Sequence, residues 1–194
     1  MRIQGELDRS IIMELVNYYD MNDIKSHGEV VASLAIKIFD CIANTTHLSS
    51  SWRDILEQAA LIHDIGQAIN LQGHDRHTYY LIRHNFITDR LPDNLRSLLA
   101  QVAGSHRLKI RKSLKKQSSD VYQKALLLVA ILRIADALDY PYAVKVEVGK
   151  FDWDGKELSI ALVAGEQGAV KKRLDKKGKL FCEILKCEVL VNNT

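Results

Sequence analysis

Histidines and aspartates of the kind that bind metal ions fall on the apolar faces of three predicted helices. His27 lies on the apolar stripe of a helix predicted over 26–43, because it precedes two valines by three and four positions. His63 lies on the inner face of the next helix, within AALIHDIG, and Asp136 lies on the apolar face of a helix predicted over 121–139. Three helices therefore direct ligand-type side chains toward one core.

Each of these residues could instead have a purely structural role. A single histidine on an apolar face is most often a core residue, and Asp136 could pair with Arg133. Burying a carboxylate is unfavourable, however, unless the carboxylate is paired or coordinates a metal. The combination, with the aspartate next to His63, favours a divalent-metal site made of His27, His63, Asp64 and Asp136.

The elements that position these residues are predicted to be helical as far as about residue 142. Helical periodicity predicts helices over 10–20, 26–43, from Ser51 to Gly66, over 77–86, within LPDNLRSLLAQVAGSHR and over 121–139. The intervening segments 67–76 and 107–120 are predicted to be loops.

The composition changes after this helical region. Strands are predicted over 143–149 and 158–163, followed by a lysine-rich helix over 166–179 and a strand at the end of the chain. The sequence therefore predicts a mainly α fold, with a helical domain over 1–142 and a small α+β C-terminal extension over 143–194.

Bulk composition narrows the class of protein. The chain has 194 residues, of which 47% are hydrophobic and 26% charged, as in ordinary globular proteins. No apolar run approaches the roughly 18 residues of a membrane span, and no signal segment is evident. The three cysteines, Cys41, Cys182 and Cys187, lack metal-motif spacing and predict reduced thiols, so we expect a cytoplasmic protein. Nucleic acid is not favoured, because the net charge is only +3 and aromatic residues do not interleave with basic ones.

The ordered pattern His27, His63-Asp64 and Asp136 resembles that of the HD-domain metal-dependent phosphohydrolases. More narrowly, AALIHDIGQAINLQGHDRHTYYLI, VAGSHR and VAILRIADALD are similar to the C-terminal HD module of the Ppx/GppA exopolyphosphatase and guanosine-pentaphosphatase family, over roughly residues 10–142. The resemblance implies an HD-type helical bundle. The larger enzymes of that family carry N-terminal actin-like domains that perform their known chemistry. This chain has no room for them, so we expect a free-standing module whose activity comes from the HD site itself.

The resemblance also implies a second metal ion. HD proteins with two metals carry further histidines between the central pair and the last aspartate, and His77 and His106 match those positions, with His74 as the alternative to His77. Asp64 would then bridge the two ions and orient a water. Mixed imidazole and carboxylate ligands suit Mn, Fe, Co, Ni or Zn, and a mononuclear site with Mg or Mn remains open.

These features predict a metal-dependent phosphohydrolase that acts on a nucleotide or another small phosphorylated compound through a metal-activated water. Arg76, Arg83, Arg107 and Lys109 are the predicted phosphate-binding residues, because they flank the candidate ligands. Segment 107–116 holds six basic residues in ten, whereas the basic stretch 171–179 is predicted to be mainly a solvated helix face. The alternative is a non-catalytic or regulatory module that binds polyphosphate or a guanosine alarmone. The sequence is compatible with a protein that forms a homo-oligomer.

Overall fold

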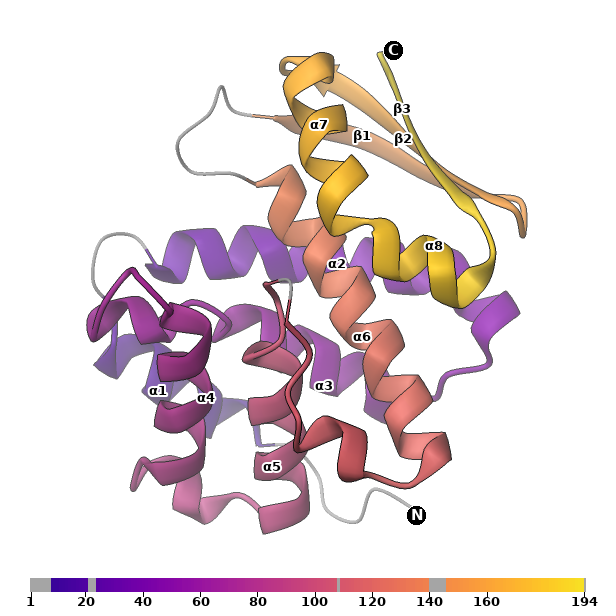
Figure 1. Ribbon diagram of the computed structural model, residues 1–194. Helices are drawn as coiled ribbons and strands as arrows, with labels where there is room; N and C mark the ends of the chain where they lie inside the picture. The colour runs from indigo at the N-terminus through magenta and orange to yellow at the C-terminus, as the bar shows by residue number, and fades with distance from the viewer. Residues whose placement is uncertain (1–7, 21–23, 108, 140–145, 194) are drawn as a thin grey trace.

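The computed structural model describes residues 8–20, 24–107, 109–139 and 146–193 (Figure 1). Helices are the main elements of the described residues before position 140. They are α1 (Arg9–Tyr18), α2 (Ile24–Thr46), α3 (Ser50–Leu61), α4 (His74–His84), α5 (Asp93–Ala103) and α6 (Ser119–Leu138), with 3-10 turns η1 (Ile65–Ala68), η2 (Thr88–Arg90) and η3 (Leu114–Lys116).

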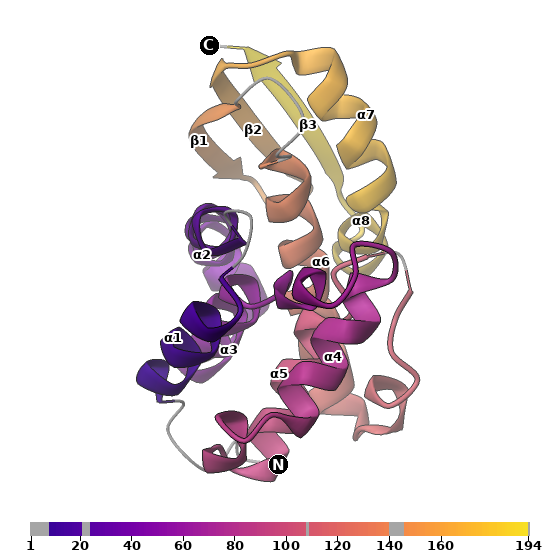
Figure 2. The same cartoon turned by 90° about the vertical axis from the view of Figure 1, so that its left-hand side faces the viewer.

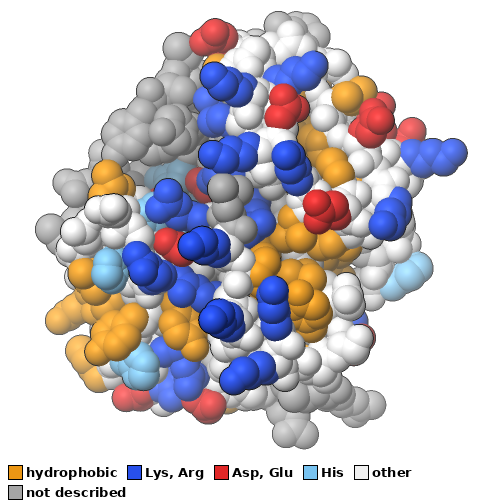
Figure 3. Space-filling model, in the orientation of Figure 1, with side chains coloured by type: hydrophobic (Ala, Val, Ile, Leu, Met, Phe, Trp, Pro, Cys, Tyr) orange, Lys and Arg blue, Asp and Glu red, His pale blue; other side chains and the backbone are white. Residues whose placement is uncertain are grey.

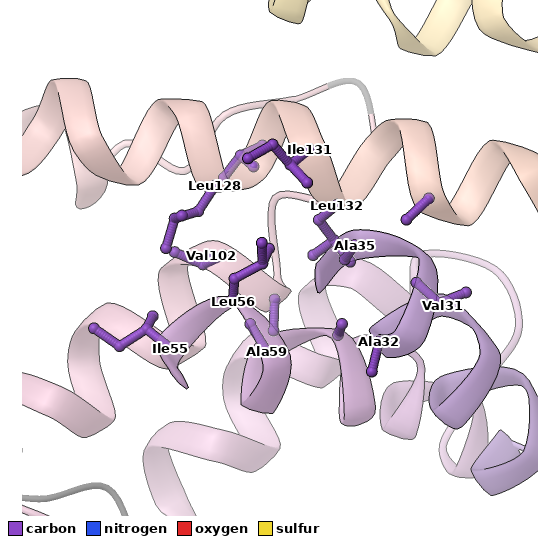
Figure 4. Packing of buried hydrophobic residues seen from close by; sticks show 14 of the residues in the cluster. Val31, Ala32, Ala35, Ile55, Leu56, Ala59, Val102, Leu128, Ile131 and Leu132 are labelled. Atoms are coloured by element: carbon purple, nitrogen blue, oxygen red, sulfur yellow. The ribbon is translucent and has the colours of Figure 1, made fainter. Parts of the chain in front are cut away.

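Helix α6 is the centre of the helical part. Every residue from Ala125 to Leu138 is buried, and only Arg133 and Asp136 interrupt the apolar residues on all sides of this part of the helix. Figure 4 shows Leu128, Ile131 and Leu132 of α6 facing residues of α2, α3 and α5. The small side chains Ala35 and Ala59 line the same core, which lets these helices approach α6 closely. One continuous core therefore holds the ends of α2, α3 and α6 in fixed positions.

The remainder of the chain forms a small α+β unit. It contains β1 (Glu147–Trp153), β2 (Glu157–Ala164), α7 (Gln167–Lys177), α8 (Lys179–Leu185) and β3 (Glu188–Asn193). Strand β2 pairs antiparallel with β1 and parallel with β3, because α7 and α8 form the crossover that a parallel pair requires. Figure 2 shows this sheet and α7 together at one end of the molecule. The predicted mainly α fold with a small α+β appendage is confirmed.

The appendage is fixed to the helical part by side-chain hydrogen bonds. Trp153 Nε1 donates to Thr45 Oγ1 at 2.8 Å, and Arg173 Nε donates to the Ala137 carbonyl at 2.8 Å. The expected domain boundary at 142 lies outside the described residues, as do positions 143–145 of the first predicted strand. That boundary stays a prediction. None of the helices in the described ranges is long and apolar enough to cross a membrane.

Two helix ends differ from the expectation in ways that matter for the site. Helix α3 ends at Leu61, not at Gly66, so His63 and Asp64 lie in the turn that follows it. Helix α4 begins at His74, not at residue 77, because Gly73 adopts the left-handed φ of 77° at its N-cap. Residue 74, predicted to lie in a loop, is therefore the first residue of a helix.

Candidate metal centre

A cluster of four histidines and two aspartates lies where five elements meet. Its members are His27 (α2), His63 and Asp64 (the turn after α3), His74 (α4), His106 (the turn after α5) and Asp136 (α6). All are buried or nearly so, and their potential ligand atoms form two groups that share Asp64. Segments far apart in the sequence thus bring ligand-type atoms into one interior space.

The first group surrounds Asp64 and Asp136. The Nε2 atom of His27 lies 3.8 Å from Asp64 Oδ2 and 3.8 Å from Asp136 Oδ1. The Nε2 atom of His63 lies 3.6 Å from Asp64 Oδ1 and 4.0 Å from Asp136 Oδ1. Two imidazole nitrogens and two carboxylates therefore face one another at separations suited to a shared cation.

The second group lies on the other side of Asp64. The Oδ1 atom of this carboxylate is 3.1 Å from His74 Nε2 and 3.3 Å from His106 Nε2. The two Nε2 atoms are 2.9 Å apart, close to the roughly 3 Å expected between two ligands of one ion with metal–nitrogen bonds near 2 Å. Asp64 is thus placed to contact both groups.

All four imidazoles use Nδ1 for a hydrogen bond to an oxygen outside the cluster. The acceptors are the carbonyls of Ala60 for His63 (2.7 Å), Ala103 for His106 (2.7 Å) and Leu71 for His74 (2.9 Å), and the Asp139 carboxylate for His27 (2.8 Å). A donated Nδ1–H leaves Nε2 as the free lone pair of the neutral ring, and metal-binding histidines generally use such a bond to fix their orientation. Each ring therefore presents Nε2 to the cluster.

Two buried atoms in this cluster have no hydrogen-bond partner among the described residues. They are His63 Nε2 and Asp64 Oδ1, in side chains that are almost completely enclosed. Buried polar atoms are normally satisfied, so orphaned ones call for an explanation such as an ion. The donor set of imidazole and carboxylate fits a divalent transition metal, so the residues present fit the expected group.

Charge within the cluster shifts the pKa values of its members. Burial raises the pKa of both aspartates, but neighbouring imidazoles, joined at Asp136 by Lys177, outweigh this effect, so the pKa values of Asp64 and Asp136 are lowered. Burial lowers the pKa of His106 to about 3. Burial also opposes protonation of His27, but the carboxylates of Asp136 and Asp139 raise its pKa to about 9. The carboxylates are therefore ionised at neutral pH and available as ligands.

Close backbone approach at two glycines brings the ligands together. A Cβ on Gly28 would lie 2.5 Å from the Leu61 carbonyl oxygen, so only glycine lets α2 place His27 against the end of α3. A Cβ on Gly66 would lie 2.2 Å from the His74 carbonyl oxygen, where η1 meets α4. The Oγ1 atom of Thr78 also links the two segments, because it accepts from Gly66 N at 3.0 Å and donates to the His63 carbonyl.

The geometry favours His74, the alternative that the sequence left open, over His77 as the candidate ligand on α4. His74 belongs to the second group, whereas His77 belongs to neither group. The reason is the earlier start of α4: His74 lies one turn before the fully buried Thr78 and shares its inward face, while His77 is rotated by about 100° from Thr78. The other five predicted ligands lie in the cluster, and their metal-binding role stays a prediction.

The four predicted phosphate-binding residues occupy different places. Arg107 is half exposed and its Nη1 lies 4.0 Å from Asp75 Oδ1, next to His74 on α4. Arg76 is exposed, and its guanidinium lies over Gly73 at the start of the same helix. Lys109 is exposed on the same segment as Arg107.

Arg83 lies elsewhere. Its Nη1 donates to Asp93 Oδ1 at 2.9 Å, and it stands nine residues along α4 from His74, which is about 13.5 Å at the helical rise. The structure therefore brings Arg76 and Arg107 near the cluster but not Arg83.

Side chains that were not predicted from the sequence also contact the cluster, and one of them is Gln67, whose Nε2 donates to Asp64 Oδ2. Asp139 accepts the Nδ1–H of His27, and its spacing of three residues from Asp136 was an available helical signal. Lys177 of α7 donates to Asp136 Oδ2. No local signal pointed to Lys177, because its position depends on how the α+β unit packs on α6. The stretch 171–179 is therefore not only a solvated face.

The fold and the cluster define a mainly α-helical protein with a buried histidine–aspartate site. Residues 8–151 match the family described as Ppx/GppA phosphatase, domain III, and the chain belongs to this family. Its membership of the wider HD-domain superfamily stays a prediction.

Two curated relatives are similar over 123 residues, or 62% of this chain. Both are guanosine-5'-triphosphate,3'-diphosphate pyrophosphatases, from Aeromonas hydrophila subsp. hydrophila at 31% identity and from Aeromonas salmonicida at 30%. The match covers 24% of each relative's length, so the matched region corresponds to about a quarter of these proteins.

Proposed function

We propose that this chain is an HD-type, divalent-metal-dependent phosphohydrolase that acts on a nucleotide or another small phosphorylated compound. The main support for this proposal is the position of Asp64 between two groups of histidine Nε2 atoms. Its Oδ1 atom is buried and has no hydrogen-bond partner among the described residues. Membership of a phosphatase family supports the reaction class, and the activity named for the two relatives supports a guanosine nucleotide as the first substrate to test.

The proposed ligands fall into two sets that share Asp64. His27, His63, Asp64 and Asp136 would hold one ion, and Asp64, His74 and His106 the other. Bound divalent cations of this kind lower the pKa of a coordinated water and stabilise charge on phosphoryl oxygens. The Nδ1 hydrogen bonds of the histidines hold their rings in place, so the chain supplies a pre-oriented ligand set.

Cationic side chains near the cluster would bind the phosphate groups. Figure 3 shows Lys and Arg side chains gathered in a band over α7 and over the segment that joins α5 to α6. Arg111 anchors that segment, because its Nε donates to the Gly104 carbonyl at 2.8 Å and its Nη2 to Asp75 at 3.3 Å. The anchor keeps the exposed Arg107 beside α4, close enough to His74 for its positive charge to act on that imidazole. We propose Arg107 and Arg76 as the main phosphate contacts.

A screen for hydrolysis tests this function. The chain loaded with Mn²⁺, Ni²⁺ or Co²⁺ should release phosphate or pyrophosphate from guanosine nucleotides or from another member of a nucleotide panel. Asp64→Asn should reduce kcat/KM by at least about 100-fold, because both proposed ions lose their shared ligand. Asp152→Asn changes an exposed aspartate on β1 and serves as the matched control. Hydrolysis that is unchanged in Asp64→Asn would sink the proposal.

A second function is favoured by one observation. The relatives are about four times longer than the matched region, which the family description numbers as domain III, so this segment could serve a larger protein as a binding module. In that role it would hold polyphosphate or a guanosine alarmone without turning it over. Isothermal titration with both ligands, beside the hydrolysis screen, separates the two functions: tight binding with no product supports the module.

A further inference from the structure

Lys177 links the C-terminal unit to the proposed metal centre. This residue ends α7, and its Nζ donates to Asp136 Oδ2. The other oxygen of the same carboxylate, Oδ1, faces the Nε2 atoms of His27 and His63 at 3.8 and 4.0 Å. The two oxygens of the carboxylate thus have different partners: Oδ1 faces the imidazoles, and Oδ2 accepts a hydrogen bond from Lys177.

The position of Lys177 is fixed by the packing of α7 on α6. Val170 and Leu174 of α7 are buried, and Arg173 Nε donates to the Ala137 carbonyl, one residue beyond Asp136. Arg173 lies four residues before Lys177, so both side chains point from the same face of α7 to the end of α6. Two cations at the C-terminal end of α6 also complement the negative end of its helix dipole.

We propose that Lys177 is a positioning residue for the metal centre: it holds Asp136 Oδ2 so that Oδ1 stays directed at the site shared with His27 and His63. The inference rests on the proposed metal site. Without the lysine, the outer oxygen of a largely buried carboxylate would lose its partner, and the group would turn to satisfy it elsewhere. Outer-shell partners of this kind typically affect metal affinity by about 10- to 100-fold.

Metal titration of the full chain tests the proposal without an activity assay. Lys177→Met removes the charge but keeps the apolar stem, and it should weaken binding of one Mn²⁺ or Co²⁺ ion by about 10- to 100-fold. Lys177→Arg should restore most of the affinity, because it retains a donor. Lys176→Met, which removes the exposed neighbouring lysine, should bind as the unmodified chain does.

The visible absorption spectrum of bound Co²⁺ provides a readout that a merely structural role would not move. At full occupancy, Lys177→Met should change the position and intensity of the Co²⁺ bands, and Lys176→Met should not. Circular dichroism establishes that the variants are folded. Lys177→Ala, which also removes the donor and suits a helix end, replaces Lys177→Met if the latter fails to fold.

The outcomes separate this inference from the proposed function. Unchanged or tighter binding by Lys177→Met, with an unchanged Co²⁺ spectrum, would overturn the positioning role while leaving the metal site intact. A chain that binds no metal at all would overturn both.

Discussion

At the scale of single residues, the centre depends on which nitrogen each imidazole presents. The four Nδ1 atoms are occupied by hydrogen bonds to oxygens, so Nε2 is the available ligand atom in every case. Helical phase predicted that His27, His63 and Asp136 point inward, because their apolar neighbours were visible in the sequence. It did not place His74, since no apolar pattern marks a residue at the very start of a helix whose N-cap is a glycine.

A pair of variants tests the ligand assignment on α4. His74→Ala should remove one of the two proposed ions, because it deletes a nitrogen 3.1 Å from the shared carboxylate. His77→Ala should retain both ions, because His77 lies outside both groups. Equilibrium dialysis with Co²⁺ or Mn²⁺ measures the number bound. The reverse pattern, with loss of an ion only in His77→Ala, would restore the choice made from the sequence.

Metal affinity should depend on pH through His27. Its pKa is raised from about 6.5 to about 9, so the folded, metal-free chain keeps this proton across the neutral range and loses it only as the pH rises through about 9. A metal ion must displace the proton, and the apparent affinity should therefore rise about tenfold per pH unit between pH 6.5 and 8. Titrations at three pH values measure the slope, and an affinity independent of pH would contradict this role for His27.

At the scale of elements, the centre depends on how closely the turns pack. The sequence patterns predicted most of the helices, but they placed the end of α3 at Gly66 instead of Leu61. Nothing in the local sequence shows that the helix must end early so that η1 can pack on α4. The short distance between the backbones of η1 and α4 explains why residue 66 is a glycine. It allows a contact that no side chain would tolerate, and its role is visible only in three dimensions.

Gly66→Ala should therefore lower the free energy of unfolding by about 2 kcal/mol or more, because its Cβ would overlap the backbone of α4. Gly168→Ala is the matched control. Gly168 lies in α7 with open space around it, so this change should raise stability by about 0.5 kcal/mol. Urea unfolding measures both. Equal effects of the two substitutions would contradict the packing argument.

At the scale of the whole molecule, a mainly α fold with a small α+β unit was predictable from the change in composition after residue 142. The contribution of the α+β unit to the candidate metal centre was not predictable in this way. Lys177 reaches Asp136 across 41 residues of sequence, and only the docking of α7 on α6 brings the two together. The strands therefore matter to the site through the helix that they help to position.

Metal binding should stabilise the whole fold. Ligands from five elements meet at the centre, so an ion bound only by the folded chain contributes about 2.7 kcal/mol at a concentration 100 times its Kd. For a chain of this size, that corresponds to a rise in Tm of roughly 5–10 °C. Thermal unfolding with and without Mn²⁺ measures the shift. Asp64→Asn should abolish it, and an equal shift in that variant would point to binding elsewhere.

We propose that the buried histidine–aspartate cluster binds two metal ions. The most direct measurement is the metal content of the purified chain, loaded with Mn²⁺, Co²⁺ or Ni²⁺ and desalted, by elemental mass spectrometry. We predict close to two ions per chain, falling below one in Asp64→Ala, because this carboxylate belongs to both groups. A content near zero in the unmodified chain, or one unaffected by Asp64→Ala, would show that this cluster is not a two-metal centre.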